Sequence, residues 1–348
     1  MTIRVAINGF GRIGRMVYRR AAQMNDIHIV AVNGTADVDV LAHLLKYDSV
    51  HGTWNEEIDV TSDGFVVGGK FTKVLSTRNP AELPWNQLDI DVVVEATGMF
   101  RSRETAGIHL QNGARKVVIT APASTDRDAD LTVVMGVNHE QYDPQRHHIL
   151  SGASCTTNCL APLVKVLNDA FGLEQGMVTT VHSYTSDQRS LDNPHKDLRR
   201  ARASAESIVP TSTGAAKAIG LVIPELKGKL NGLSLRVPTP NVSVVDLVAN
   251  LSTPVTKEQV NEVLAASAVS SMTGIVAYTE KPLVSVDFNG DSRSAIIDGL
   301  STIVLGETSV KVLAWYDNEW GYSCRIVDLV RLAVQPQVVN PLEMIARS

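Results

Sequence analysis

The sequence has few cysteines, little net charge and no long hydrophobic run. Three cysteines in 348 residues do not suggest a disulfide framework, so we expect a cytoplasmic location. No stretch approaches the roughly 18 apolar residues of a membrane span, and the first residues lead directly into a predicted strand, so we expect no signal peptide and no membrane partner. A net charge of −5 gives no reason to expect a nucleic acid as partner.

Length and composition indicate two domains. With 44% hydrophobic residues in 348, the chain can bury a large core. In the first half, helical segments such as residues 101–112 alternate with apolar runs that favour strands, at residues 5–8, 29–33, 92–95, 116–120 and 131–135. This alternation predicts an α/β domain with a Rossmann-type doubly wound parallel sheet.

The second half has a different pattern. Longer apolar runs predict strands at residues 176–184, 232–237, 242–251, 297–305 and 309–316, and helical patterns cover residues 256–268 and 322–332. These elements favour an α+β domain of mixed sheet and helices, entered by a helix that begins near Thr156. Residues 183–207 are rich in arginine, aspartate and lysine, which is typical of a long polar connection.

The N-terminal glycines form a nucleotide-binding motif. Gly9, Gly11 and Gly14 follow the pattern G-x-G-x-x-G, with a predicted strand before them and a predicted helix at residues 15–23 after them. Glycine at these positions permits a tight turn and a close approach of the backbone, and the start of the helix can receive a pyrophosphate. In this context the motif predicts a dinucleotide site.

The end of the second predicted strand lacks the acidic residue that usually binds the ribose hydroxyls of NAD. Gly34 and Thr35 follow Asn33 there, while Asp37 and Asp39 lie slightly too far along the chain for that contact unless a loop returns them. A carboxylate would repel a 2′-phosphate, so its absence leaves NADP open as a cofactor beside NAD.

A second motif supplies a nucleophile. Cys155 stands in the run Ser-Cys-Thr-Thr-Asn-Cys at the predicted start of a helix, where unpaired N–H groups and the helix dipole lower a thiol pKa. A thiolate can add to an aldehyde, and the resulting thiohemiacetal can release a hydride to a nicotinamide, so the two motifs together indicate aldehyde oxidation. Cys155 and Cys159 could also form half of a metal site, but no second ligand pair accompanies them and we expect no metal.

Six separated blocks carry a resemblance to a known family. They are INGFGRIGR at 7–15, LLKYDSVHG at 44–52, ASCTTNCLAP at 153–162, PHKDLRRARA at 194–203, PTSTGAAKAIG at 210–220 and WYDNEWGYS at 315–323. In this order the chain resembles the phosphorylating glyceraldehyde-3-phosphate dehydrogenases over practically its whole length. The resemblance implies a homotetramer. Each subunit would have a dinucleotide-binding domain at 1–154, a catalytic domain at 155–318 and a C-terminal helix within 319–348 that packs back on the first domain.

The resemblance implies a reaction and two catalytic residues. D-glyceraldehyde 3-phosphate would be oxidised to 1,3-bisphosphoglycerate with NAD or NADP and inorganic phosphate, through a thiohemiacetal and a thioester on Cys155. His182 matches the base of the family; it would favour the thiolate and then take the proton of the substrate hydroxyl. The backbone N–H of Cys155 together with His182 would hold the developing oxyanion.

The resemblance also assigns binding residues. Thr185 and Arg236 are expected to bind the substrate phosphate, with Asp187 positioning its neighbours. The residues expected to bind the inorganic phosphate are Ser154, Thr156, Arg200, Thr213 and Gly214, which offer the hydroxyls, N–H groups and guanidinium that a phosphate requires. The residues expected to contact the cofactor, beyond the glycine motif, are Arg12, Ile13, Asn33, Gly34, Thr35, Arg78, Thr97, Thr120 and Asn318, of which Asn318 would hold the nicotinamide carboxamide.

Three positions depart from the family pattern. Gly34 replaces the aspartate of NAD-specific members and Thr35 replaces a common leucine, whereas Pro194 is the residue that NAD-using members carry, so we predict relaxed specificity for NAD and NADP. Gly152 stands where asparagine is usual and adds backbone freedom before Cys155. Residues 335–348 extend beyond the resemblance and carry no chemistry that can be assigned.

Two other functions stay open at this point. A relative that oxidises erythrose 4-phosphate and hydrolyses the thioester is the enzymatic alternative, but it departs from the pattern seen here at Tyr184-Thr185 and Thr213-Gly214. A non-catalytic binding protein, for instance one that binds RNA, would use the same fold without the chemistry. The presence of both Cys155 and His182 argues against a purely binding role.

Overall fold

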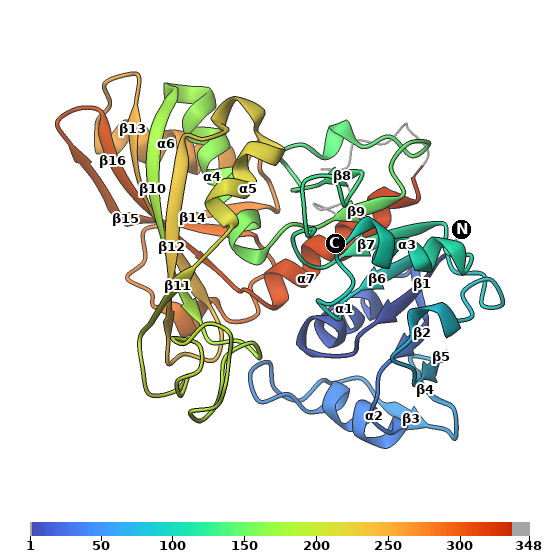
Figure 1. The fold of residues 1–348 in the computed structure, drawn as a ribbon. Helices are drawn as coiled ribbons and strands as arrows, with labels where there is room; N and C mark the ends of the chain where they lie inside the picture. The colour runs from blue at the N-terminus through green and yellow to red at the C-terminus, as the bar shows by residue number, and fades with distance from the viewer. Residues whose placement is uncertain (1, 336–348) are drawn as a thin grey trace. The chain divides into compact units, whose positions relative to one another are not determined.

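The computed structural model of the chain describes residues 2–335. These residues divide into two units, each with its own sheet (Figure 1). Residues 2–133, 139–154 and 323–335 form the first unit, and residues 134–138 and 155–322 form the second. Among the described residues, no helix is long and apolar enough to cross a bilayer.

The first unit is built on a mostly parallel sheet. Its strands are β1 (Ile3–Asn8), β2 (Ile27–Asn33), β3 (Ile58–Val60), β4 (Gly64–Val67), β5 (Lys70–Leu75), β6 (Val92–Glu95), β7 (Lys116–Ile119), β8 (Leu131–Thr132) and β9 (Ile149–Ser151), in the spatial order β3-β4-β5-β2-β1-β6-β7-β9-β8. The strands from β5 to β8 in this order pair in parallel, whereas β3, β4 and β5 pair antiparallel at one edge. The predicted α/β sheet is confirmed. The order reverses at β1, which has β2 on one side and β6 on the other, and ligands bind at such switch points.

Helices accompany this sheet. They are α1 (Arg12–Ala22), α2 (Val38–Lys46), α3 (Arg103–Gln111) and α7 (Trp320–Ala333), with short 3₁₀ turns η1 (Pro80–Glu82) and η2 (His139–Gln141). The end of α7 is bound to the first unit by a 2.9 Å ion pair from Arg331 Nε to Asp26 and by a 2.7 Å hydrogen bond from the Tyr142 hydroxyl to the carbonyl of Ala333. The range predicted for the C-terminal helix, 319–348, includes residues 336–348, which lie outside the described residues.

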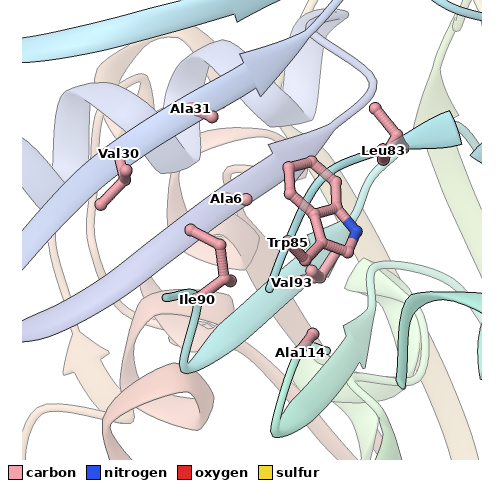
Figure 2. Packing of buried hydrophobic residues seen from close by; sticks show 8 residues of the cluster. All are labelled: Ala6, Val30, Ala31, Leu83, Trp85, Ile90, Val93 and Ala114. Atoms are coloured by element: carbon pink, nitrogen blue, oxygen red, sulfur yellow. The ribbon is translucent and has the colours of Figure 1, made fainter. Parts of the chain in front are cut away.

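A cluster of apolar side chains fills the space beneath β1, β2 and β6 (Figure 2). Trp85 is fully buried and lies against the strands, and the other members are Ala6, Val30, Ala31, Leu83, Ile90, Val93 and Ala114. The near-continuous apolar runs that predicted these strands are those expected of parallel strands buried on both faces. Trp85 therefore anchors the segment that leads from β5 to β6 against the sheet.

The second unit has a mixed sheet. Its strands are β10 (Leu173–Ser183), β11 (Val209–Ser212), β12 (Leu230–Val237), β13 (Ser243–Leu251), β14 (Val276–Thr279), β15 (Ala295–Leu305) and β16 (Ser309–Tyr316), in the order β11-β12-β10-β13-β16-β15-β14. Most neighbours are antiparallel, while β10 pairs with β12 and β14 with β15 in parallel. This confirms the predicted mixed sheet.

Helices cover one face of this second sheet. They are α4 (Cys155–Phe171), α5 (Ala215–Val222) and α6 (Lys257–Ala268), with 3₁₀ turns η3 (Pro224–Leu226) and η4 (Ser285–Phe288). Along β13 the side chains alternate, so that Val245 and Leu247 are buried while Val248 is 41% exposed. Alternation of this kind marks a sheet with one face on the core and one face open. The open face of the single chain carries apolar as well as polar residues.

The elements differ from the sequence-based prediction in several places. The strand predicted at 131–135 ends at Thr132, because Val134 N–H turns to the side chain of Asn138 instead of continuing a ladder. The helix α2 and the antiparallel strands β3 and β4 were not predicted. By contrast, the helix predicted at 256–268 begins one residue later behind a capping box of Thr256 and Gln259.

Candidate active site

Cys155 is the first residue of α4, as expected for a nucleophile at a helix start. The chain enters the helix through Ala153, whose φ of 54° lies in the left-handed region that few non-glycine residues adopt. Ala153 N–H donates to Ser151 Oγ over 3.1 Å, and Ser151 Oγ donates to the carbonyl of Ala121 over 2.9 Å. The backbone two residues before the nucleophile is thus strained at Ala153. Hydrogen bonds to Ser151 in β9 and from Ser151 to Ala121, which follows β7, stabilise this conformation.

His182 lies next to Cys155. It is the penultimate residue of β10, and its Nε2 is 3.5 Å from Cys155 Sγ. Its Nδ1 is 2.7 Å from the carbonyl oxygen of Ser183, which can only accept a hydrogen bond. Nδ1 also contacts the guanidinium of Arg236, which can only donate, so these two partners do not fix the ring tautomer. In the tautomer with its proton on Nδ1, Nε2 presents a lone pair to the thiol.

Arg236 approaches the same imidazole from the neighbouring strand. The parallel register of β10 and β12 pairs His182 with Arg236, and the guanidinium contacts the imidazole and donates to the carbonyl of Ser183 over 2.9 Å. Burial, together with the positive charge of Arg236, lowers the pKa of His182 to about 3. His182 is thus a neutral imidazole at physiological pH, ready to accept a proton.

Burial, and not the start of the helix, has the largest effect on the pKa of the Cys155 thiol. Burial of Sγ raises the pKa of Cys155 above its ordinary value, while the charge of Arg236 and hydrogen bonds from the start of α4 oppose that rise. The prediction of a lowered thiol pKa was therefore wrong for this structure. Burial thus raises the pKa of the Cys155 thiol and lowers that of the His182 imidazole.

Tyr316 supports both sides of this pair and was missed from the sequence. Its hydroxyl is 2.8 Å from Thr156 Oγ1 and 2.9 Å from Thr180 Oγ1, and its ring packs edge-on against His182 with centroids 6.0 Å apart. Thr156, which we expected to bind the inorganic phosphate, is buried, and its hydroxyl contacts that of Tyr316. The block at 315–323 that carries the resemblance contains Tyr316, which was the available signal.

Two serines fix the orientation of Asn318. Ser183 Oγ and Ser243 Oγ both donate to Asn318 Oδ1, over 2.9 and 2.8 Å, and Ser183 N–H donates to Ser243 Oγ. With its oxygen occupied by two donors, Asn318 must present its NH₂ group elsewhere. Neither serine was identified from the sequence, because both are ordinary strand residues that lie far from Asn318 along the chain.

Arg200 is held by partners from the long connection and from β11. Its guanidinium forms an ion pair with Asp187, and its Nε donates to Thr211 Oγ1 over 3.0 Å. We expected Asp187 to position its neighbours at the substrate phosphate; in the structure it pairs with Arg200, which was assigned to the inorganic phosphate. The carboxylate of Asp187 pairs with the guanidinium of Arg200 because the two groups carry opposite charges and lie within hydrogen-bonding distance.

The remaining predicted phosphate residues lie at the ends of elements. Thr185 follows β10, and its carbonyl accepts from Gln188 N–H in a turn. Thr213 Oγ1 accepts from Ala215 N–H at the start of α5, and Gly214 is the N-cap of that helix. Ser154 directly precedes α4. Helix starts offer free N–H groups to anions, so Ser154 and Gly214 stand where phosphate donors are expected.

The glycine motif has the geometry that a dinucleotide requires. Gly9 adopts φ +97°, and an added Cβ would lie 2.6 Å from Thr97 N, while a Cβ on Gly14 would lie 2.2 Å from the carbonyl oxygen of Gly9. Gly11 is different, because its Cβ would meet no protein atom within 4 Å. Neither backbone nor packing demands glycine at position 11, and the open space there is what a closely approaching ligand needs.

A cavity of about 590 Å³ adjoins this motif in the first unit. Of the predicted cofactor residues, seven line it, namely Gly9, Gly11, Asn33, Gly34, Thr35, Arg78 and Thr97; Phe10, Thr77, Met99 and Phe100 were not predicted. Asp37 is the N-cap of α2 and Asp39 lies in its first turn, and neither is among the residues that line the cavity.

Five predicted cofactor residues are not among the residues lining this cavity. Arg12 donates to Asp48 over 3.0 Å, and Thr120 Oγ1 donates to the carbonyl of Glu95 over 3.1 Å. Ile13 and Gly14 lie within α1, and Asn318 belongs to the second unit. Within residues 2–335, no group of three or more histidine, cysteine, aspartate or glutamate side chains is arranged to hold a metal ion.

Comparisons with known proteins agree with this geometry. The family model described as "Glyceraldehyde 3-phosphate dehydrogenase, NAD binding domain" matches residues 3–103, and "Glyceraldehyde 3-phosphate dehydrogenase, C-terminal domain" matches residues 154–318. The chain is 60% identical over 329 residues to a glyceraldehyde-3-phosphate dehydrogenase of Geobacillus stearothermophilus, covering 94% of this chain and 97% of that protein. It is 57% identical over 331 residues to glyceraldehyde-3-phosphate dehydrogenase 2 of Bacillus subtilis, covering 95% and 96%.

Proposed function

Because this chain belongs to the glyceraldehyde 3-phosphate dehydrogenase family, we propose that it catalyses the phosphorylating oxidation of D-glyceraldehyde 3-phosphate. The observation that carries the proposal is the 3.5 Å contact between Cys155 Sγ and His182 Nε2 at the start of α4. A thiol in contact with an acceptor imidazole is the pair that covalent oxidation of an aldehyde requires.

The chemistry follows from the protonation states. His182 Nε2 takes the proton of Cys155, the thiolate adds to the aldehyde carbon, and the carbonyl oxygen takes that proton back to give a thiohemiacetal. Neutral His182 then removes the hydroxyl proton as hydride leaves the same carbon, which turns the thiohemiacetal into a thioester. NAD supplies the hydride acceptor when it is bound. Inorganic phosphate attacks the thioester, and the acyl phosphate leaves as Cys155 is released.

We propose two anion sites beside this pair. Arg236, with Thr185, binds the substrate phosphate, and Arg200 binds the inorganic phosphate together with the helix starts at Ser154–Thr156 and Thr213–Gly214. Two observations support the division. Arg236 contacts His182 directly, whereas Arg200 is oriented by Asp187 and Thr211. A guanidinium held by a carboxylate is preorganised for a second anion.

The cofactor proposal is NAD with relaxed acceptance of NADP. The residues of the cavity fit a dinucleotide, since Gly11 leaves open space at the start of α1. At the end of β2, Gly34 and Thr35 line the cavity together with exposed Arg78. No carboxylate among the lining residues repels a 2′-phosphate, and Arg78 with the Thr35 hydroxyl can attract one.

We propose a cytoplasmic homotetramer with the predicted domains 1–154 and 155–318. Direct cross-strand partners place Met177, Val248, Lys311 and Ile303 in one row on the open face of the second sheet. Met177 is 67% and Ile303 55% exposed in the single chain, which supports a subunit interface on this face. Three cysteines in 348 residues suggest no disulfide framework, which supports a reducing compartment.

The proposal is tested by following the absorbance of reduced cofactor. We expect reduction of NAD with glyceraldehyde 3-phosphate that depends on inorganic phosphate, and we expect no turnover by Cys155→Ser, because an alkoxide forms far less readily than a thiolate. Phosphate-independent oxidation of erythrose 4-phosphate would identify the alternative enzyme. Absence of reduction with both aldehydes would refute the enzymatic proposal.

A further inference from the structure

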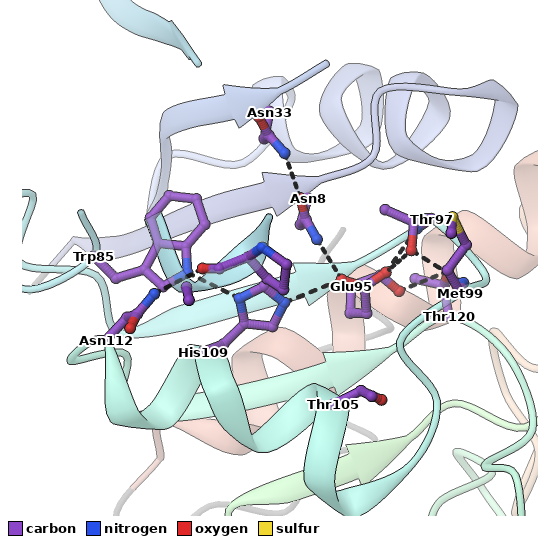
Figure 3. Close-up of polar contacts among 12 residues, drawn as sticks. Asn8, Asn33, Trp85, Glu95, Thr97, Met99, Thr105, His109, Asn112 and Thr120 are labelled. Atoms are coloured by element: carbon purple, nitrogen blue, oxygen red, sulfur yellow. Dashed lines mark hydrogen bonds and ion pairs between the residues drawn. The ribbon is translucent and has the colours of Figure 1, made fainter. Parts of the chain in front are cut away.

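The mechanism leaves the buried acidic residue Glu95 unused. Glu95 ends β6, directly below the cavity of the first unit, and its side chain and that of His109 are both 0% exposed. Figure 3 shows hydrogen bonds running from Glu95 toward β2 on one side, toward Thr97 on another and toward Trp85 on a third. A carboxylate at this depth requires a full set of hydrogen-bond donors.

The first branch is oriented by the backbone of Thr77. Thr77 N–H donates to Asn33 Oδ1 over 3.1 Å, and Asn33 Nδ2 donates to the carbonyl of Thr77 over 3.0 Å, so the amide of Asn33 can be placed in one orientation only. Asn33 Nδ2 then also donates to Asn8 Oδ1 over 2.7 Å. Asn8 is left with its NH₂ group facing Glu95, to which it donates over 2.6 Å.

The second branch is oriented by Trp85. The indole N–H can only donate, and it donates to His109 Nδ1 over 3.0 Å. The proton of His109 is therefore on Nε2, which donates to the same Glu95 oxygen as Asn8 does, over 3.1 Å (Figure 3). The tautomer of His109 follows from the chemistry of its partner.

The third branch reaches the loop after β6. Thr97 N–H donates to the other oxygen of Glu95 over 2.8 Å, and the Thr97 hydroxyl contacts that oxygen too. Thr97 Oγ1 accepts in turn from Met99 N–H over 3.0 Å. Every neighbour of the Glu95 side chain is thus a donor, and each chain of donors ends on a backbone or indole group that cannot be reversed.

The first and third branches of this network end at residues that line the cavity. Thr77 and Asn33 line it on one side, and Thr97 and Met99 line it on another. We propose that Glu95 is a positioning residue for the cofactor: an acceptor on which the two walls of the dinucleotide site converge. This inference rests on the proposed cofactor site and assigns no contact between Glu95 and the cofactor itself.

The test compares NAD binding by four forms of the full-length protein, using titration calorimetry without aldehyde. Glu95→Gln puts an amide NH₂ among donors, and we expect its Kd for NAD to rise about tenfold. Asn8→Asp opposes two carboxylates, and we expect a comparable loss. The double variant sets an amide NH₂ against a carboxylate, so it should bind NAD more tightly than either single variant.

This rescue separates positioning from a merely structural role, which predicts that the two losses add. Glu104→Gln, an exposed glutamate on α3, is the control and should bind like the wild type. Additive losses, or wild-type binding by Glu95→Gln, would overturn the proposal. Where Glu95→Gln does not fold, Thr97→Val removes the link to Met99 at a partly exposed site and should weaken NAD binding severalfold; unchanged affinity there would equally overturn it. Because the Kd for NAD is measured without aldehyde, this test stays valid even if the protein does not oxidise glyceraldehyde 3-phosphate.

Discussion

The positive charge of Arg236 lowers the pKa of both reacting groups, for two different reasons. Its charge lowers the pKa of His182, because it opposes a second cation, and it lowers the pKa of Cys155, because it favours the thiolate. A substrate phosphate bound to Arg236 would neutralise this charge and make His182 a better proton acceptor. Substrate binding and proton transfer are thereby linked through one residue.

Replacing Arg236 should therefore shift two titrations upward. In Arg236→Ala we expect the pKa of Cys155 to rise, because burial is then opposed by less positive charge, and the pKa of His182 to rise from its lowered value. The rate of thiol alkylation by iodoacetamide, measured against pH, should show its inflection at a higher pH than in the wild type. Arg236→Lys keeps the charge and is the control. An unchanged alkylation profile in Arg236→Ala would contradict the assigned contact.

Single residues differ in how far the sequence identified them. Cys155 stands in a distinctive motif and His182 was assigned through the family resemblance, whereas Tyr316 and the two serines that orient Asn318 were not identified. The hydrogen bond from Tyr316 to Thr156 spans 160 positions of the chain. Such contacts are set by the register of strands in the sheet, and nothing in the local pattern encodes them.

Among the elements, the polar connection between β10 and β11 carries Arg200 toward the proposed inorganic-phosphate site. Arg200→Ala removes a charge-assisted hydrogen bond worth roughly 1.5–3 kcal/mol, so we expect the KM for inorganic phosphate to rise more than the KM for aldehyde. Arg202 lies on the same connection, is exposed and pairs with Asp192. Arg202→Ala should leave both KM values unchanged, and steady-state kinetics with each substrate varied in turn decides the matter. An equal rise of both KM values in Arg200→Ala would contradict the assignment of Arg200 to a separate inorganic-phosphate site.

The turn between β2 and α2 should set cofactor preference. A Cβ at position 34 would lie 3.0 Å from Leu41 Cδ1, so Leu41 must move slightly for any side chain there. Gly34→Ala measures this steric cost alone. Gly34→Asp adds a carboxylate that repels a 2′-phosphate, and we expect it to lower kcat/KM for NADP at least about tenfold relative to NAD. The wild type should use NADP within about tenfold of NAD; rejection of NADP by a thousandfold would refute relaxed specificity.

Whole elements were predicted where a periodic signal was long. The capped helix α6 and the strands β1, β2 and β6 were found, because apolar runs and capping residues mark them. The helix α2 was missed, since it has only nine residues, and Val40 and Leu44 on it are exposed in the single chain. The short strands β3 and β4 extend the sheet edge by antiparallel pairing, which local alternation of three or four residues does not reveal.

At the scale of the whole molecule, the open face of the second sheet distinguishes a single chain from the proposed tetramer. Met177→Asp places a charge in the exposed row of Met177, Val248 and Ile303, so the subunit should still fold, because this side chain is 67% exposed. Burying an unpaired carboxylate in an interface is strongly unfavourable, so the tetramer should dissociate to a smaller species. Val269→Asp introduces the same charge at an 82% exposed site after α6, away from that face, and should keep the wild-type mass. Light scattering coupled to size-exclusion chromatography measures both. A Met177→Asp protein that retains the mass of the tetramer would show that the subunits meet through another surface.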